Sequence, residues 1–366
     1  MGWKRVDFLE TGDSYYNAVV AEIANAKKSV LLESYIFRLD RVGIRILDAL
    51  CAAVGRGVKI FLRIDGVGSR IDLAAIAAYC GNAKLDLEVF HPLPFAAPGA
   101  YHPSGLAKAD SFLARWRMIN RRSHRKLIIV DETIAFTGGR NIDEVQSEEY
   151  SGAAAWHDLS LRLEGPAMED LVKAFWFKPF PIFPKNPVRD LLPNYSWRMR
   201  QSRNKWFVRR MRRAQEKIWI VTPYFAPTPL MLFHLRAAAR RGVDVRIILS
   251  QKTDVMISRW AAVGLYHRLL QWGVRIFEYK PSLLHRKLWI IDQTAVVGSA
   301  NFNHRSFMHD LELDIVLREP AQVETARELF RKDENESLRI EKDQMEKLPF
   351  WTKTVTWFAG WFSYWL

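Results

Sequence analysis

His124-Arg125-Lys126-Leu127-Ile128-Ile129-Val130-Asp131 has a second copy later in the chain, His285-Arg286-Lys287-Leu288-Trp289-Ile290-Ile291-Asp292. Both copies follow the pattern His-x-Lys-x-x-x-x-Asp. A turn of small residues and an asparagine follows each copy, Gly138-Gly139-Arg140-Asn141 in the first and Gly298-Ser299-Ala300-Asn301 in the second. A single His-x-Lys triplet carries little information. Two copies with matching apolar runs and matching turns indicate that the chain contains an internal duplication.

The apolar centre of each copy predicts a short strand that is buried on both faces. Residues i and i+2 of a strand share a face, so each histidine is expected on the same side as the lysine two positions on. Two imidazoles and two ammonium groups around one pocket make a site for an anion. One imidazole can attack phosphorus and the other can protonate the leaving oxygen. The side chains expected to hold the non-bridging phosphate oxygens are Lys126, Lys287, Asn141 and Asn301.

A strand–helix–strand unit also occurs once in each half. Residues 29–36 predict a strand, 43–55 a helix, and 56–65 a turn into a second strand. The corresponding segments of the second half are 217–224, 229–240 and 241–249. Strands that alternate with helices indicate an α/β fold.

We therefore predict two tandem, pseudo-symmetric α/β halves, each a mixed β-sheet flanked by helices. The active site is expected at the interface between the halves, where the two motif strands would meet. The predicted divisions are 1–190 for the first half, 191–340 for the second half and 341–366 for an aromatic tail that associates with a membrane.

Composition points to an anionic partner, because the 366 residues carry a net charge of +14. The partner is either nucleic acid or an anionic membrane surface, and 14 tryptophans and 21 phenylalanines favour the membrane. Cys51 and Cys80 lie in alanine-rich helical sequence and are expected to be buried thiols rather than part of a disulfide framework. We expect neither a secretory leader nor a membrane-spanning helix.

Three segments leave alternatives open. Residues 91–123 mix apolar side chains with arginines, which fits either a solvated helix against the core or a flap that meets lipid. The connector 173–207 is aromatic and then strongly basic, so it is either a solvated face or a contact for an anionic surface. The tail 350–366 is shorter than the about 20 apolar residues that a membrane-spanning helix needs. It is either an interfacial anchor or a segment packed on the protein's own surface.

The duplicated motif and its turn resemble those of the phospholipase D superfamily, from about the first strand to about residue 320. Within it the chain is similar to the short bacterial cardiolipin synthases, which lack N-terminal membrane spans. That similarity is carried by Gly12, Tyr15-Tyr16, Glu33-Ser34-Tyr35-Ile36-Phe37 and Leu163-Glu164-Gly165-Pro166. The resemblance implies transfer of a phosphatidyl group to a histidine and then to a hydroxyl of phosphatidylglycerol. It implies no metal and no organic cofactor.

The catalytic residues that the resemblance implies are His124, Lys126, Asp131, His285, Lys287, Asp292, Asp158 and Glu312. Asp158 and Glu312 occupy equivalent places in the two halves, where the superfamily has an acid that holds the second nitrogen of the histidine. Asp131 and Asp292 lie at the far end of a buried strand, and we expect them to brace the turn. His124 is predicted to be the nucleophile and His285 the general acid and base. His157 and His309 lack the spacing of metal ligands.

The partners expected on this basis are phospholipids, with phosphatidylglycerol first and phosphatidylethanolamine as a second candidate, and the anionic surface of the membrane. Nucleic acid is disfavoured. The expected location is the cytoplasmic face of the bacterial inner membrane, with peripheral attachment. Three other functions stay open: a phospholipase that accepts water, a nuclease of the same superfamily, and a membrane-binding protein without catalysis. Two intact motifs argue against the last, and the aromatic tail argues against the nuclease.

Overall fold

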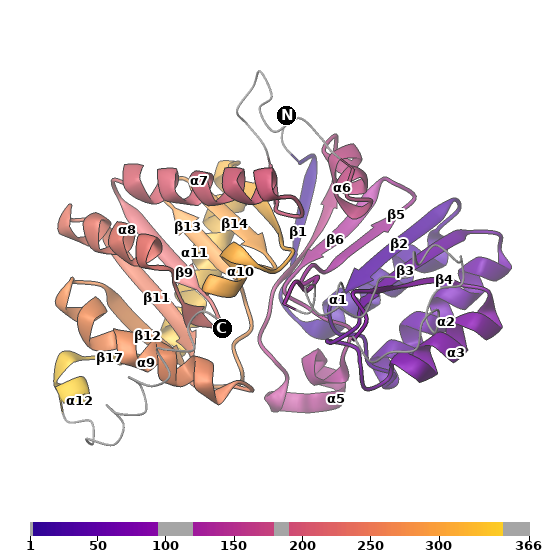
Figure 1. Ribbon diagram of the computed structural model, residues 1–366, viewed down its shortest axis with the longest axis horizontal. Coiled ribbons are helices and arrows are strands. Elements are labelled where there is room, and N and C mark those ends of the chain that lie inside the picture. The colour runs from indigo at the N-terminus through magenta and orange to yellow at the C-terminus, as the bar shows by residue number, and fades with distance from the viewer. Residues whose placement is uncertain (1–2, 94–119, 179–189, 347–366) are drawn as a thin grey trace. The chain divides into compact units, whose positions relative to one another are not determined.

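The computed structural model describes residues 3–93, 120–178 and 190–346, which belong to two compact units (Figure 1). The first unit comprises Met1–Leu191 together with His309–Leu313, and the second comprises Leu192–Met308 and Asp314–Leu366. Most of the segment 91–123, for which a solvated helix or a flap was expected, lies outside the described residues, as do part of the connector and the whole tail 350–366.

The first unit is built on a seven-stranded sheet with the order β1-β7-β6-β5-β2-β3-β4. Strands β2, β3 and β4 are parallel, whereas β1, β7, β6, β5 and β2 pair antiparallel in turn. The strands are β1 (Arg5–Leu9), β2 (Ser29–Ser34), β3 (Lys59–Asp65), β4 (Asp86–Phe90), β5 (Leu127–Val130), β6 (Ile134–Gly138) and β7 (Ser160–Glu164).

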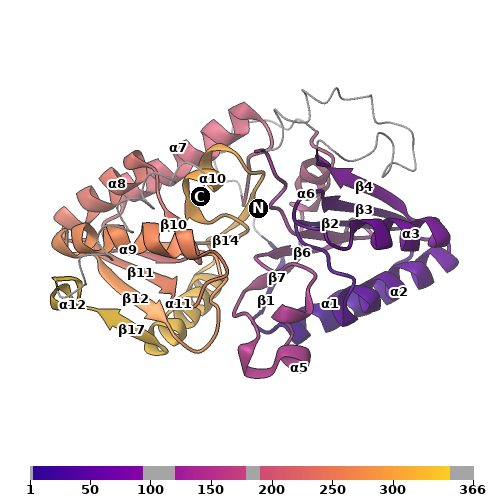
Figure 2. The ribbon, with the colours of Figure 1, turned by 60° about the horizontal axis from the view of Figure 1, so that its bottom comes forward.

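Helices cover both faces of this sheet. On one face α1 (Gly12–Asn25), α2 (Arg41–Gly55) and α3 (Leu73–Ala83) share a core with the strands (Figure 2). On the other face Phe175 of α6 (Met168–Phe175) packs on Phe61 of β3, with ring centroids 5.8 Å apart. Short turns of helix follow β6: η1 (Glu144–Gln146), α5 (Glu148–Ser151) and η2 (Gly152–Ala154).

The second unit is built on an eight-stranded sheet with the order β17-β12-β11-β9-β13-β14-β16-β8. A separate pair of short parallel strands, β10 and β15, lies beside it. The strands are β8 (Leu191–Pro193), β9 (Lys217–Val221), β10 (Phe225–Ala226), β11 (Asp244–Ser250), β12 (Arg275–Tyr279), β13 (Leu288–Ile291), β14 (Thr294–Gly298), β15 (Phe302–Asn303), β16 (Leu313–Leu317) and β17 (Ser337–Ile340). The helices are α7 (Trp197–Arg213), α8 (Pro229–Arg240), α9 (Met256–Gln271), α10 (His304–Met308), α11 (Pro320–Asn335) and α12 (Lys342–Glu346).

The two sheets have the same strand order. The series β1-β7-β6-β5-β2-β3-β4 of the first unit corresponds to β8-β16-β14-β13-β9-β11-β12 of the second, and β17 is an addition at the far edge. From β16 to β12, parallel and antiparallel pairs occur at the same places as from β7 to β4 in the first unit. The predicted fold class, two tandem α/β halves with mixed sheets flanked by helices, is confirmed.

Predicted helices begin where their capping residues lie. The helix expected at 229–240 is α8, residue for residue. Thr228 accepts the N–H of Met231 at 3.3 Å, and Pro229 occupies the first turn, where its missing N–H costs nothing. Helix α2 begins two residues earlier than expected, because Asp40 caps it by accepting the N–H of Gly43 at 2.9 Å.

Helix α7 was not predicted, since the connector was expected to be an aromatic and basic segment. Its buried stripe recurs every four residues at Met199, Arg203, Phe207 and Met211. Arg203 interrupts the apolar pattern, although it is buried and its guanidinium pairs with Asp314 at 2.7 Å. Because one of the buried positions of α7 is an arginine, the apolar residues alone did not show the periodicity of a helix.

The two cysteines are free thiols. Cys80 is buried, as predicted, whereas Cys51 is only partly buried. Of the helices within the described ranges, none has the length and apolar character needed to cross a membrane.

Candidate active site

The histidine and lysine of each motif lie immediately before a strand. Strand β5 begins at Leu127 and β13 at Leu288, and every residue of both strands is buried, as expected. His124 and Lys126 themselves lie in the extended lead-in and not in the sheet ladder. The lead-in has another partner, because Ser123 forms a parallel bridge with Leu311. That partner is part of His309–Leu313, the segment that belongs to the first unit.

Glu312 holds the imidazole of His124. The Nδ1 atom of His124 lies 3.2 Å from Oε2 of Glu312, whose side chain is wholly buried, while that of His124 is 12% exposed. The backbone fixes the same approach, since His124 N–H donates to the Leu311 carbonyl at 2.9 Å and Leu311 N–H donates to the Arg122 carbonyl at 2.8 Å. A carboxylate on Nδ1 orients the ring and leaves Nε2 as the atom for chemistry.

Each motif lysine donates a hydrogen bond to the backbone of the histidine two residues before it. Lys126 Nζ donates to the carbonyl oxygen of His124 at 2.8 Å, and Lys287 Nζ donates to the carbonyl oxygen of His285 at 2.5 Å. Lys287 Nζ also lies 2.8 Å from Nδ1 of His285. Both lysines are buried. The ammonium group of Lys287 therefore lies next to the imidazole of its own motif, whereas Lys126 is bound to the backbone of His124.

The arginine between the histidine and the lysine of each motif points into the protein and anchors the segment that leads into the strand. Arg125 pairs with Glu33 at 2.6 Å and donates to the Ala174 carbonyl at 2.8 Å. Arg286 pairs with Asp333 at 2.8 Å. All four ion-pair side chains are wholly buried. Loss of one partner from such a pair leaves an uncompensated buried charge, so each arginine is held in the interior and ties the lead-in of its strand to it.

The two motif aspartates accept backbone N–H groups at the start of the central strands. Asp131 accepts from Lys27, Lys28 and Ser29 at 2.7–2.9 Å. Asp292 does the same for Gln215, Glu216 and Lys217, with closest distances of 2.9–3.1 Å. Both aspartates adopt a left-handed backbone, with φ of 51° and 50°. Burial opposes ionisation of Asp131, but the three N–H donors outweigh it and hold its pKa below the usual value.

The asparagines after the motifs sit in different surroundings. Asn141 is buried, its Oδ1 accepts the N–H of Ile36 at 3.3 Å, and its carbonyl accepts the hydroxyl of Tyr16 at 2.8 Å. Asn301 N–H donates to Ser306 Oγ at 3.1 Å. Its buried Oδ1 has no hydrogen-bond partner among the described residues. A ligand that hydrogen-bonds to this amide would satisfy it.

Sheet register shows that Asp158 and Glu312 are equivalent. Gly138 pairs with Ser160 and Gly298 pairs with Asp314, so each acid stands two residues before the matched strand position. Both side chains are buried. Asp158 Oδ1 accepts the N–H of Leu159 at 2.7 Å. A Cβ atom at Gly139 would collide with the Asp158 carboxylate, which explains a glycine at this point of the first turn.

Two tyrosines beside the histidines were not predicted to be part of the site. Tyr35 meets His124 edge-on with ring centroids 5.1 Å apart, and Lys126 Nζ lies 5.3 Å from the same ring centroid. Tyr224 meets His285 edge-on at 6.2 Å. Both follow the ends of the central strands β2 and β9, which places them at the same sheet edge as the histidines. An aromatic residue just past each central strand was the available sequence signal.

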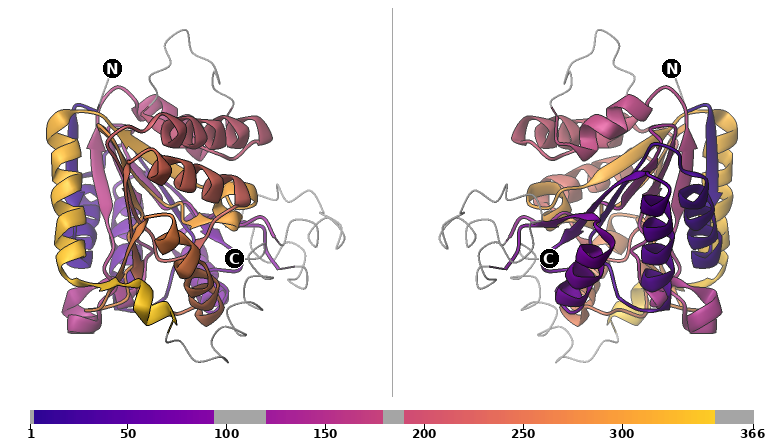
Figure 3. Two further views of the ribbon diagram at one scale, coloured as in Figure 1. Left: turned by 90° about the vertical axis from the view of Figure 1, so that its left-hand side faces the viewer. Right: turned by 90° about the vertical axis from the view of Figure 1, so that its right-hand side faces the viewer.

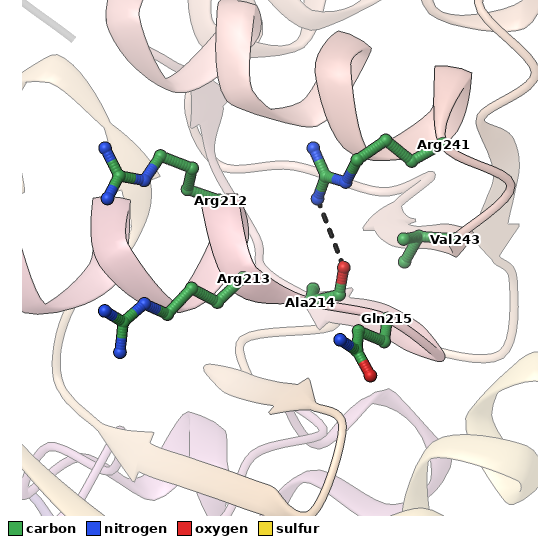
Figure 4. A pocket seen from close by; sticks show the side chains of 6 residues that line it. All are labelled: Arg212, Arg213, Ala214, Gln215, Arg241 and Val243. Atoms are coloured by element: carbon green, nitrogen blue, oxygen red, sulfur yellow. Dashed lines mark hydrogen bonds between the residues drawn. The ribbon is translucent and has the colours of Figure 1, made fainter.

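A pocket of about 520 Å³ lies elsewhere in the second unit, where α7 ends (Figure 4). It is lined by Arg212, Arg213, Ala214, Gln215, Arg241 and Val243. His285 precedes β13, whose first residue pairs with Val221, the last residue of β9. The pocket lies at the other end of β9, next to Lys217, so it is separate from His285 and Lys287. One of its lining residues, Gln215, donates its backbone N–H to the motif aspartate Asp292.

Comparison with known families places the motifs in context. A family model described as "Cardiolipin synthase, PLD-like domain" matches residues 19–150 and 207–334, which is more than half of the chain. Cardiolipin synthase B of Salmonella typhimurium is 28% identical over 375 residues, which cover 96% of this chain and 87% of the relative. Cardiolipin synthase of Clostridium perfringens is 30% identical over 371 residues, covering 93% and 73%.

Solved structures share the fold. The crystal structure of phosphatidylserine synthase from Haemophilus influenzae aligns with a TM-score of 0.70 at 13% identity, covering 98% of this chain and 93% of that one. Polyphosphate kinase from Porphyromonas gingivalis aligns with a TM-score of 0.59 at 13% identity, covering 90% of this chain and 50% of the kinase. At this identity the likeness concerns the fold alone.

Proposed function

The chain belongs to the cardiolipin synthase family of the phospholipase D superfamily, and from this premise we propose that it makes cardiolipin through a phosphohistidine. It is a phosphatidyltransferase that acts on phospholipids. In the proposed reaction a donor phospholipid gives its phosphatidyl group to His124, and a hydroxyl of phosphatidylglycerol then takes it. Phosphatidylethanolamine is a second candidate participant.

The observation that carries this proposal is the contact between His124 and Glu312. The 3.2 Å approach of Oε2 to Nδ1 leaves Nε2 as the nucleophilic atom of the imidazole. The wholly buried carboxylate stabilises the positive charge that the ring acquires when Nε2 bonds to phosphorus. A nucleophile, a group that orients it and nearby cationic donors are the parts that covalent phosphoryl chemistry requires.

The proposed reaction has two steps that balance. First, Nε2 of His124 bonds to phosphorus while the bond from phosphorus to the leaving alcohol breaks, and His285 gives that oxygen a proton. Second, His285 takes the proton of the acceptor hydroxyl, whose oxygen bonds to phosphorus as the bond to Nε2 breaks. Lys126, Lys287, Asn141 and Asn301 are proposed to hold the non-bridging oxygens.

This proposal requires the two motifs to serve one phosphate. The internal duplication supports it, because both units place an imidazole and a buried ammonium group at the same end of the matching strand. Asp158 is proposed to do for the second motif what Glu312 does for the first, on the ground of their matched register. Asp131 and Asp292 are proposed to act on the backbone that carries the motifs.

We further propose peripheral attachment to the cytoplasmic face of the bacterial inner membrane. The net charge of +14 suits an anionic lipid surface. The aromatic tail 350–366 is proposed as an interfacial anchor on its composition, which includes Trp351, Trp357, Trp361 and Trp365. Both proposals rest on sequence and on the family.

The test has two parts. Purified protein is incubated with labelled phosphatidylglycerol, with and without phosphatidylethanolamine, and the lipid products are resolved. Cardiolipin is the expected product. Phosphatidic acid alone would mean that water is the acceptor and that the protein is a phospholipase. Cleavage of nucleic acid with no lipid product would refute the proposal outright.

The covalent step is tested with a phosphatidyl donor that has an activated leaving group. His285→Ala, which lacks the general acid, should still accumulate label on a peptide that contains His124. His124→Ala should accumulate none. Label on His285 in the His124→Ala protein would reverse the two roles, and no label in either variant would refute the phosphohistidine.

A further inference from the structure

The two faces of the second unit's sheet differ in charge. Helices α7, α8 and α9 cover one face and α11 covers the other (Figure 3). Eight arginines and lysines occur in α7, two in α8 and two in α9, and none of these helices contains an aspartate or glutamate. In contrast, α11 contains four acidic and three basic residues. The layer formed by α7, α8 and α9, called the basic face below, is therefore suited to an anionic partner.

Large apolar side chains are exposed where the helices of the basic face begin. Trp197 opens α7 and is 73% exposed, Leu230 and Phe233 in the first turns of α8 are 55% and 62% exposed, and Met256 opens α9 at 56%. Scattered apolar residues on a surface are normal, but a group of this kind at one end of three adjacent helices marks a site of interaction.

The exposed apolar end is the end that carries the motif. Helix α7 leads into β9, and α8 and α9 each follow a parallel strand, so all three begin beyond the carboxyl ends of β9 and β11. His285 lies at the same edge, because the strand that it precedes starts opposite Val221. The first unit repeats this arrangement on its own sheet, where Ile44 in the first turn of α2 and Ile71 just before α3 are 41% and 67% exposed.

The outward side of the basic face becomes cationic toward the far end of the helices. Along α8 the exposed residues after Phe233 are Arg236 and Arg240. Around the pocket at the end of α7, Arg241 is tied to the carbonyls of Met211 and Ala214 at 3.1 and 3.2 Å (Figure 4). The side chains of Arg212 and Arg213 project beside it.

The pKa of His234, which lies near these arginines, is affected by their positive charge. Burial, followed by the charges of Arg212 and Arg241, lowers the pKa of His234 below its usual value. His234 lies on α8, on the side turned to the core. The arginines around the pocket thus impose a positive field on the buried side of α8 as well as on solvent.

We propose that the basic face docks on an anionic phospholipid bilayer, with Trp197, Leu230, Phe233 and Met256 entering the interfacial layer and the arginines on lipid phosphates. This inference deepens the proposed function, on which it rests for the lipid nature of the substrate. Docking of this kind presents the edge that carries His285 to the layer from which a phospholipid headgroup is taken. Exposed tryptophan and phenylalanine among arginines are typical of interfacial surfaces. A duplex nucleic acid would use the arginines but would leave the apolar end in water.

The test measures partitioning of the full chain, on a His124→Ala background so that lipid is not consumed. The vesicles are phosphatidylcholine alone and phosphatidylcholine with phosphatidylglycerol. Arg209 and Arg213 are two exposed arginines of α7. Arg209→Gln with Arg213→Gln should reduce the partition coefficient on the anionic vesicles by about tenfold or more, since each cation near such a surface contributes about fivefold. The matched control, Arg331→Gln with Lys332→Gln on α11, removes the same charge and should change it by less than about twofold.

Apolar insertion is tested separately. Trp197→Ser with Phe233→Ser should reduce partitioning by about tenfold or more on both kinds of vesicle, because the lost term is burial of apolar surface. The control is Leu338→Ser on β17, which also removes an exposed apolar side chain and should have little effect. The free energies with which different parts of the chain bind the vesicle add, so their effects on the partition coefficient multiply. A second anchor elsewhere in the chain therefore does not hide the fold-change caused by the two substitutions.

Equal partitioning of the face variants and their controls would overturn the inference. So would binding of double-stranded DNA through Arg209 and Arg213 by a chain that leaves vesicles unbound. Turnover of phosphatidylglycerol in detergent micelles by the unaltered chain keeps the two proposals apart. If the unaltered chain turns over phosphatidylglycerol but the face variants partition as it does, the docking proposal is refuted and the proposed function stands. Variant-sensitive partitioning without turnover refutes the proposed function alone.

Discussion

Glu312→Gln should reduce kcat by about 10–10⁴-fold and leave KM within about threefold. The substitution preserves the shape of a wholly buried side chain and removes its charge. A hydrogen bond to a charged group contributes about 1.5–3 kcal/mol, which corresponds to about 10–150-fold when it is made only in the transition state. The amide can also donate to Nδ1 and stabilise the wrong tautomer of His124, which accounts for the upper part of the range.

The assay is turnover of labelled phosphatidylglycerol in detergent micelles, so that membrane docking does not enter the rate. Accumulation of the His124 adduct from an activated donor is followed in parallel and should slow by a similar factor. Asp310→Asn is the matched control, because it removes a carboxylate from the same segment, where Asp310 accepts the N–H of Arg122 at 3.3 Å. Its kcat should stay within about threefold of the unaltered protein.

Two outcomes would refute this reasoning. Full activity of Glu312→Gln would mean that the carboxylate does not prepare the nucleophile. An equal loss in Asp310→Asn would mean that both substitutions act by loosening the segment His309–Leu313, and the direct role of Glu312 would fall.

Asp131→Asn should lower the free energy of unfolding by about 1–2 kcal/mol at neutral pH. Because the folded pKa of Asp131 is below the usual 3.8, its stabilisation is present above that value and is lost as the pH falls through the folded pKa, so denaturant titrations of the two proteins should converge in acid. Arg125→Met should cost about 3 kcal/mol or more in the same measurement, since it leaves Glu33 buried beside fewer charges, and a second change, Glu33→Leu, should recover part of the loss. Turnover should survive EDTA, because lysines and asparagines supply the charge stabilisation, and a loss that one divalent ion restores would contradict the mechanism. Deletion of residues 350–366 should weaken vesicle flotation more than turnover in micelles, and unchanged flotation would contradict the anchor.

Local patterns carried most of the fold. The buried strands β5 and β13 and the helix α8 follow from unbroken apolar runs, a threonine cap and a proline, which act within a few residues of themselves. The duplication then fixed the architecture, because whatever the first half forms the second half forms as well. Helix α7 escaped prediction because the buried Arg203 finds its partner, Asp314, far along the chain.

The sequence indicated which residues belong to the site but did not indicate which of them lie in contact. Matched spacing identified Asp158 and Glu312, and the sheet register agrees with that match. The pairing of Glu312 with the first histidine depends on a segment from the second half of the sequence that joins the first unit, and no local pattern encodes such an exchange. The tyrosines beside the histidines lie just beyond the strand ends, where side-chain direction depends on the connecting turns.

The position of the segment His309–Leu313 in the first unit has a consequence for synthesis on the ribosome. Residues 1–191 emerge first and contain the whole first motif, yet the carboxylate that orients His124 is translated only after the second motif is complete. At about 5–20 residues per second, roughly 6–25 s separate the two events. During that interval the nascent chain carries a histidine without its acid. The first half of the chain on its own therefore lacks the carboxylate that prepares the proposed nucleophile.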